Sequence, residues 1–337
     1  MFTIYGVAMM VNSKQYYVGY GLLSKTNYLV VIYMSLLPIY AFYVFAKRGL
    51  LTEKTMKYMA FVFLALAISN FMSNQARLVQ LAIENKTFAE EFTNNSGYAF
   101  VGLLPVIVLF YKKPMLQYLF LAICAYYIVL SMKRGAMLSG GLCIIWFLAN
   151  NMKGASNKRR WFVVLASMSV AVMVYYFVRY MMETSAYFQL RVVQTESGDS
   201  SGRDVLYSEI FQSFINQDSP FHLLFGNGAN SILLLLGQYA HNDWLSLAIE
   251  QGLVGILIYI IYWIALYKVW RRTQHHPQAF MSIGMFLIIY FLISFFSMSF
   301  NGVPRSSAMV LGYYLATGFE SLGSKNIKTI SISEQSV

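Results

Sequence analysis

Nine long apolar stretches make up most of this chain, and each comes close to the length of a membrane-spanning helix. A helix needs about 20 mostly apolar residues to cross the hydrocarbon core of a bilayer. The stretches lie at about 27–46, 55–73, 98–111, 115–131, 136–150, 161–182, 252–268, 279–299 and 305–321. We therefore predict an all-α, polytopic membrane protein with about nine transmembrane helices in a single integral membrane domain, residues 1–337. Residues 1–20 carry Asn12 and Lys14 near their middle, so we interpret them as an interfacial segment rather than a tenth span.

The composition excludes other classes of protein. Only 12% of the residues are charged and 58% are hydrophobic, whereas a soluble domain carries about 25% charged residues. The net charge of +11 does not indicate nucleic-acid binding, because the basic residues form short clusters between the apolar stretches. Clusters of this kind are topology signals. Cys124 and Cys143 lie within apolar stretches and are interpreted as packing residues, and no Cys/His spacing indicates a metal site.

The basic residues also predict the orientation. If nine spans alternate, fifteen of the 25 Lys and Arg residues fall on one side of the membrane. That side is the cytoplasm by the positive-inside rule, so the amino terminus lies outside and residues 322–337 form a cytoplasmic tail. The sequence has no internal repeat and no glycine- or proline-broken half-helix paired with a counterpart elsewhere. Both observations argue against the plan of many transporters.

A polar segment at residues 183–243 interrupts the apolar pattern on the outer side. It holds seven of the 14 acidic residues and two of the four histidines. In a membrane protein, a concentration of ionisable groups marks a site that binds or transfers a polar ligand. We therefore predict that this segment is a large outer loop and the working part of the molecule.

Two basic elements are predicted on this outer side. Lys133 and Arg134 occupy a tight turn between the fourth and fifth spans, against the orientation bias. They either snorkel from a helix end or bind an anion. Arg203 follows Ser201, which has the S-x-x-D spacing of a capping box with Asp204. The apolar residues after it recur on one face and predict a helix that packs through Val205, Leu206, Ile210, Phe211, Phe214 and Ile215.

Arg203 would then lie in the first turn of that helix. Helix-terminal N–H groups together with a guanidinium suit phosphate oxygens. The alternative is an exposed arginine paired with Asp199 or Asp204.

His241 opens the stretch HNDWLSLAIEQGLVG at the outer edge of the seventh span. A lone histidine at a membrane boundary is more often a hydrogen-bonded structural residue than a catalytic one. The triplet Gly226-Asn227-Gly228 upstream is interpreted as a turn, because a lone G-x-G is poor evidence for phosphate binding.

Taken together, these segments resemble the family of bacterial O-antigen polymerases and O-antigen ligases. His241 to Gly255 resembles the family's H-N-x-x-L…G-x-x-G signature, and Ser201 to Arg203 resembles the S-G-R segment of its large outer loop. Met132 to Ala136 is similar to the S-R-G turn that opens a span, with lysine where serine is usual. The resemblance covers roughly residues 125–270.

The resemblance implies a multispanning, inverting glycosyltransferase that acts on undecaprenyl-diphosphate-linked glycans at the periplasmic face without a metal or other cofactor. Lys133, Arg134 and Arg203 would bind the donor diphosphate, and His241 would be the catalytic residue, as proton acceptor or as a ligand of the acceptor or a phosphate. Asn242, Asp243 and Arg305 would orient the histidine or bind the acceptor. The implied location is the bacterial inner membrane.

The leading hypothesis is an O-antigen polymerase, because the chain is short and its signature has the acid-flanked form HNDWL…E-x-G. Its partners would be the lipid-linked oligosaccharide and a chain-length regulator in the same membrane. The alternatives are the ligase, which moves the finished glycan to the lipid A core, and a flippase or transporter of the lipid-linked glycan. A flippase predicts charge deep inside several spans, and apart from Glu250, near the outer boundary, the sequence shows little of it.

Overall fold

The computed structural model describes residues 16–18, 21–23, 37–85, 94–152, 157–184, 189, 192–193, 202–217, 219–228, 231–237, 239–297 and 306–318. The chain divides into two compact units. One unit comprises Met1–Leu37, Arg191–Lys268 and Tyr290–Val303, and the other comprises Pro38–Leu190, Val269–Ile289 and Pro304–Val337. We refer to them as the loop unit and the bundle unit, and describe each by itself.

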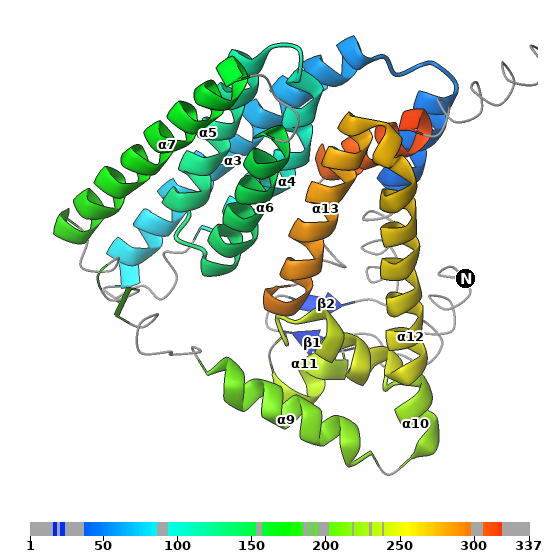
Figure 1. Ribbon diagram of the computed structural model, residues 1–337. Coiled ribbons are helices and arrows are strands. Elements are labelled where there is room, and N and C mark those ends of the chain that lie inside the picture. Colours follow the sequence, from blue (N-terminus) through cyan, green and yellow to red (C-terminus); the bar gives the residue numbers. More distant parts are fainter. Residues whose placement is uncertain are drawn as a thin grey trace, which may run out of the picture. The chain divides into compact units, whose positions relative to one another are not determined.

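The bundle unit consists of helices that pack side by side (Figure 1). Apolar segments form helices because a helix satisfies every backbone hydrogen bond within the segment. The helices are Leu37–Lys47, α3 (Glu53–Asn85), α4 (Gly97–Leu103), α5 (Pro114–Leu130), α6 (Arg134–Met152), α7 (Asn157–Thr184) and a helix at 306–318, with the 3₁₀-helices η1 (Leu104–Phe110) and η2 (Thr273–His275). The first part of α13 (Pro277–Phe296) also belongs to this unit.

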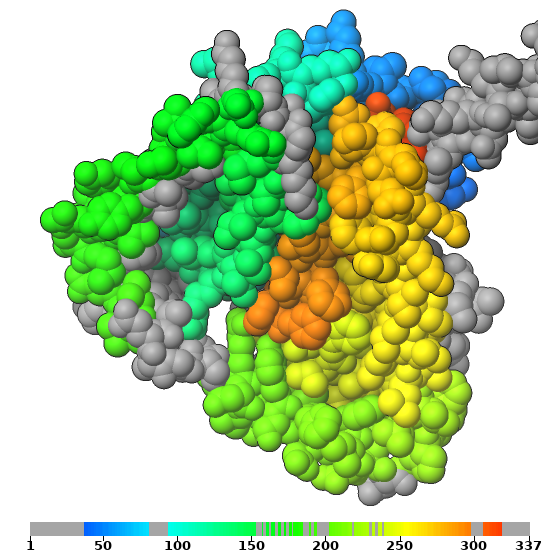
Figure 2. Space-filling view, viewed as in Figure 1, coloured from blue at the N-terminus to red at the C-terminus, as the bar shows by residue number. Residues whose placement is uncertain are grey.

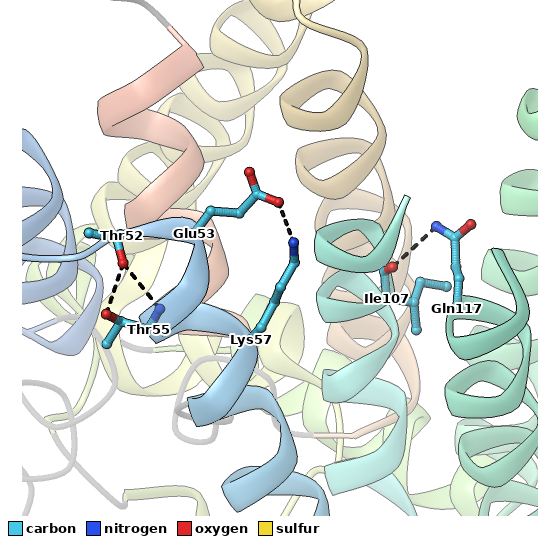
Figure 3. Close-up of polar contacts among 6 residues, drawn as sticks. All are labelled: Thr52, Glu53, Thr55, Lys57, Ile107 and Gln117. Carbon is cyan, nitrogen blue, oxygen red and sulfur yellow. Dashed lines mark hydrogen bonds and ion pairs between the residues drawn. The ribbon is translucent and has the colours of Figure 1, made fainter. Parts of the chain in front are cut away.

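Two local features, a helix cap and a hydrogen bond between helices, explain where these helices begin and how they join (Figure 3). Thr52 caps α3, because its Oγ1 accepts the N–H of Thr55 at 3.2 Å. The second feature lies at the junction of α4 and η1, where η1 follows α4 without a gap. Pro105 lies in the first turn of η1, and all seven residues of η1 are buried. Gln117 of α5 donates from Nε2 to the carbonyl of Ile107 in η1 at 3.1 Å. This hydrogen bond ties α5 to a backbone group in the apolar interior.

An aromatic cluster joins three helices of the bundle. Phe100 of α4 stacks on Tyr127 of α5 with ring centroids 4.5 Å apart, and Phe71 of α3 meets both rings edge-on. Such pairs contribute about 0.5–1.5 kcal/mol each beyond the area they bury. The hydroxyls of Ser282 in α13 and Ser307 in the helix at 306–318 donate to carbonyls of the α4–η1 rod. The rod is therefore the centre of the unit.

The loop unit is built from shorter elements. They are the strands β1 (Tyr16–Val18) and β2 (Gly21–Leu23), the helices α9 (Arg203–Ile215), α10 (Pro220–Phe225) and α11 (Ser231–Leu236), and most of α12 (Asp243–Arg272), with the end of α13. The two strands are antiparallel, with Tyr16 opposite Leu23. This hairpin is the exception to the all-α prediction within the described residues, and its first strand falls within residues 1–20, where an interfacial segment was expected.

Every predicted apolar stretch overlaps a described helix, so the helical nature of the spans is confirmed. Within the described ranges, α3, α6, α12 and α13 are long and apolar enough to cross a membrane. Leu37–Lys47, Gly97–Phe110 and Pro114–Leu130 are apolar but shorter. The chain is a membrane protein, and the count of about nine spans stays a prediction.

Candidate active site

Arg203 is the first residue of α9, as predicted, but the helix begins differently from the prediction. The N-cap residue is Gly202, with φ 74°, and no side chain caps the helix. Asp204 is therefore the second residue of the helix and not the third, and Ser201, the other member of the predicted capping box, lies outside the described residues. The left-handed backbone at position 202 suits glycine, which pays no penalty for a Cβ there.

Fewer residues of α9 are buried than its apolar pattern predicted. Leu206 and Ile210 are buried, whereas Val205, Phe211 and Ile215 are more than half exposed. Leu206 and Ile210 form a core with three residues from the segment that follows, and partly buried side chains surround it. The core residues from that segment are Ile232, Ala240 and Ile249. In Figure 2 the atoms of α9 and α10 (light green) form a continuous surface with the yellow atoms of the following segment.

Three side chains converge on the carboxyl end of α13. Arg203 donates from one terminal nitrogen to the carbonyl of Phe296 at 3.2 Å. Asn242 donates to the carbonyl of Phe295 at 3.3 Å, and the hydroxyl of Tyr207 lies 3.5 Å from the same oxygen. The last carbonyls of a helix have no partner within the helix and attract cations. The end of α13 therefore anchors α9 and the segment that begins at His241.

His241 lies directly beside this anchor. Its carbonyl is 3.4 Å from the hydroxyl of Tyr207, which lies one helical turn after Arg203. Its side chain is exposed. Asn242, which is buried, accepts the N–H of Leu245 through its side chain at 3.1 Å and so caps α12. The backbone around His241 is fixed by neighbours while its ring faces outward.

Asp243 differs from His241 in its surroundings. It is only 3% exposed, and the hydroxyl of Tyr259 donates to its Oδ2 at 3.1 Å. The next residue, Trp244, donates from Nε1 to the hydroxyl of Ser294 at 3.0 Å. Both contacts hold the start of α12 from within the protein. Of the roles predicted for Asp243, its burial favours orientation over contact with an acceptor.

Tyr239, two residues before His241, is not an alternative proton acceptor. Partial burial raises the pKa of Tyr239, and the negative charge of Glu250 raises it further. Tyr239 therefore stays protonated near neutral pH and cannot act as a proton acceptor. A neutral imidazole can accept a proton near neutral pH, so histidine suits that role.

The second basic element belongs to the bundle unit. Lys133 and Arg134 lie in the turn between α5 and α6, as predicted, and Arg134 is the first residue of α6. Ser131, which is fully buried, accepts the N–H of Lys133 at 3.3 Å through its hydroxyl, and its carbonyl accepts the N–H of Asn94 at 3.0 Å. The side chain of Asn94 donates from Nδ2 to the carbonyl of Phe71 at 3.0 Å. Hydrogen bonds of the buried residues Ser131 and Asn94 therefore hold the backbone of the turn in place.

The two motif turns share an unusual backbone. Met132, at φ 53°, and His241, at φ 49°, are the non-glycine residues with left-handed φ in the described part of the chain. A non-glycine residue in this region costs about 1–3 kcal/mol and persists where the surrounding structure enforces it. One residue precedes the Lys133–Arg134 pair and the other is the predicted catalytic residue. Such strain is typical of functional sites.

The helix that follows His241 is broken. Gly252 of α12 has φ 64° and ψ −163°, so residues 243–251 and 253–272 form two separate helical segments. We call them the first arm and the second arm. The break was not anticipated from the sequence. It explains Gly226 of the upstream turn, because a Cβ there would collide with backbone atoms of Glu250 and Gln251. The N–H groups of Asn227 and Gly228 in the same turn donate to the carbonyls of Ile249 and Glu250 at 2.8 and 3.1 Å.

Replacing Gly252 should disturb this junction strongly. A Cβ at Gly252 would lie 2.6 Å from backbone atoms of Leu224 and Gly226, and a left-handed backbone alone costs an L-residue roughly 1–2 kcal/mol. We expect Gly252→Ala to lower the melting temperature of the detergent-solubilised protein by about 4–8 °C, since about 2 kcal/mol corresponds to that shift in a chain of this size. Gly141→Ala in α6 is the control, because a Cβ there meets nothing within 4 Å. Equal melting temperatures for both variants would contradict the tight junction.

The structure thus brings Arg203, Asn242, Asp243 and His241 together around the end of α13, and it places Lys133 and Arg134 in the bundle unit. Arg305 lies outside the described residues. Sequence reasoning missed Tyr207 and Tyr259, whose hydroxyls make contacts that only the fold creates. The spacing of Tyr207 one turn after Arg203 is the signal that could have found it.

These features define a helical membrane protein with a polar site at the ends of its helices. Comparison with known families identifies the segment further: residues 119–260 match the sequence model of the O-antigen ligase family. The match includes all three motif elements, so the resemblance is confirmed over this segment, and it indicates a function of the O-antigen polymerase or ligase type. No curated protein matches the chain.

Proposed function

We propose that this protein is an O-antigen polymerase of the bacterial inner membrane. It would transfer a growing glycan from its undecaprenyl diphosphate onto the next lipid-linked repeat unit at the periplasmic face, with a chain-length regulator as a partner. The observation that carries the proposal is the placement of an exposed histidine beside an anchored arginine at the end of α13, within the segment that matches the family.

The chemistry of the transfer fits these residues. A sugar hydroxyl of the acceptor attacks the anomeric carbon of the donor, and the bond from that carbon to the diphosphate oxygen breaks. The diphosphate leaves with the electron pair, and a guanidinium stabilises its charge through paired N–H donors. The proton of the attacking hydroxyl passes to His241, because a neutral imidazole is a suitable general base. We propose Arg203, Arg134 and Lys133 as the diphosphate ligands.

The positions of the cations support this assignment. Arg134 lies at the amino end of α6, where the helix dipole is positive. A cation at that end is electrostatically unfavourable by itself, whereas an anion bound there is stabilised. A diphosphate would gain from both the dipole and the side chains.

The ligase is the second candidate, because the matching model describes O-antigen ligases. The two enzymes share the donor and differ in the acceptor, so a deletion strain separates them. We expect lipopolysaccharide with a single repeat unit on a gel, which wild-type expression should convert back to long chains. Unmodified lipid A core together with retained lipid-linked polymer would instead identify the ligase. Unchanged long-chain lipopolysaccharide would overturn both.

A further inference from the structure

The two arms of α12 turn back toward each other. A continuous helix rises 1.5 Å per residue, so residues sixteen apart are separated by about 24 Å along the axis. Asp243 and Tyr259 are sixteen apart, yet the Tyr259 hydroxyl lies 3.1 Å from Oδ2 of Asp243. The ring of Trp244 also meets the Tyr259 ring, with centroids 4.9 Å apart. The arms therefore form a sharp bend with its corner at Gly252.

The corner is closed by backbone contacts. The break frees the carbonyls of Ile249 and Glu250, and the N–H groups of Asn227 and Gly228 satisfy them. A broken helix at membrane depth is tolerated where neighbouring protein re-satisfies its backbone groups in this way. The corner is thus a built feature of the fold, but it lies nine or more residues from His241. The corner contacts alone would not fix the position of the far end of the first arm, at Asp243.

The Tyr259–Asp243 hydrogen bond closes the open side of the bend. Asp243 is 3% exposed and Tyr259 is 2% exposed, so water does not compete for this bond. A hydrogen bond between two buried side chains is stronger than an exposed one, because the local dielectric constant is low. It fixes the start of the first arm to the second arm, two residues from His241. The end of α13 holds the same point from its other side through Asn242 and Trp244.

We infer that Tyr259 is a positioning residue for His241. It touches neither donor nor acceptor in this role; it acts through Asp243 by setting the angle of the arm that presents the histidine. The inference rests on the proposed function of His241. A shift of about 1 Å in a reacting group reduces rates by as much as about 100-fold without loss of binding. The effect of losing Tyr259 should therefore appear in kcat.

The test is Tyr259→Phe in the full-length purified protein, assayed with lipid-linked repeat units. The ring and its packing remain, and only the hydroxyl is removed. We expect kcat to fall about 10- to 100-fold with KM for the donor changed less than about twofold. Tyr262→Phe is the matched control on the second arm, because its ring stacks on Tyr259 at 6.1 Å and no role is assigned to it. It should retain near wild-type kcat.

Variants of Asp243 show whether the hydrogen bond itself is responsible. Asp243→Ala removes the acceptor of the Tyr259 hydroxyl and should lower kcat by as much as Tyr259→Phe. The double variant Asp243→Ala/Tyr259→Phe should be no worse than either single one, since both remove one interaction. Additive losses in the double variant would overturn the inference.

Failure of this inference is distinguishable from failure of the proposed function. Wild-type kcat in Tyr259→Phe beside an inactive His241→Gln would remove Tyr259 alone. Absence of elongation by the wild-type protein in the same assay would remove the proposed function, whereas normal activity in both His241→Gln and Arg203→Ala would remove only the roles of these two residues. A fall in kcat equal to that of Tyr262→Phe would show only a general effect of losing a hydroxyl from the second arm, and would also overturn the inference.

Discussion

His241→Gln should leave chain elongation nearly inactive. Loss of a positioned general base typically lowers the rate about 10²- to 10⁴-fold. Glutamine keeps the ability to form hydrogen bonds but does not accept a proton at neutral pH, so it separates proton transfer from binding. The side chain of His241 is exposed while its backbone is held by Tyr207, so the replacement should not disturb the surrounding packing. The measurement is single-turnover elongation of lipid-linked repeat units by the purified variant, with and without chelator.

Two controls sharpen this result. His222→Gln changes another exposed histidine of the same unit, in α10, and should leave elongation near wild type. His241→Asn fits the left-handed backbone at φ 49°, because asparagine tolerates that region, and should also be inactive. Substantial elongation by His241→Gln would leave the histidine a binding role only. Loss of wild-type activity in chelator would indicate a metal mechanism and a wrong assignment.

The sequence predicted the helices well because each apolar stretch carries its own evidence. A run of apolar residues must form a helix in lipid, whatever it packs against, and each of the nine stretches overlaps a described helix. The same reasoning placed Lys133 and Arg134 in a turn, because a short polar interval separates two such runs. These features are local and require no knowledge of the partner elements.

Features that depend on distant partners were missed. Gly252 belongs to the G-x-x-G part of the signature, but only its contact with Gly226, 26 residues earlier, shows that the helix bends sharply there. Tyr259 looked like any tyrosine of a span, because its bond to Asp243 exists only once the helix bends back. In α9 the apolar residues Val205 and Phe211 were assigned to the packed face although they are exposed. The side that packs is set by α11 and the start of α12, which periodicity within α9 does not specify.

Arg203→Ala should abolish elongation at matched expression. Arg203 is the predicted ligand of the donor diphosphate, and its guanidinium is held by the carbonyl of Phe296. That bond engages one of its five N–H donors and fixes the direction of the planar group. Arg203→Lys should restore little, because an ammonium is a point charge and cannot reproduce the planar fork that meets two phosphate oxygens. The readout is the length distribution of lipopolysaccharide on a gel, with protein levels measured by immunoblot.

A second pair of variants separates diphosphate binding from anchoring of α9. Tyr207→Phe removes the neighbouring hydroxyl near the Phe295 and His241 carbonyls but leaves the positive charge in place, so it should reduce elongation less than Arg203→Ala. Arg179→Ala removes an exposed arginine that pairs with Glu183 within α7, and should have no effect. If Tyr207→Phe is as inactive as Arg203→Ala, the arginine acts by holding α9 to α13. Near-normal polymer in Arg203→Ala cells would remove the residue from the site, because a diphosphate that leaves with its full charge requires a cation at that position.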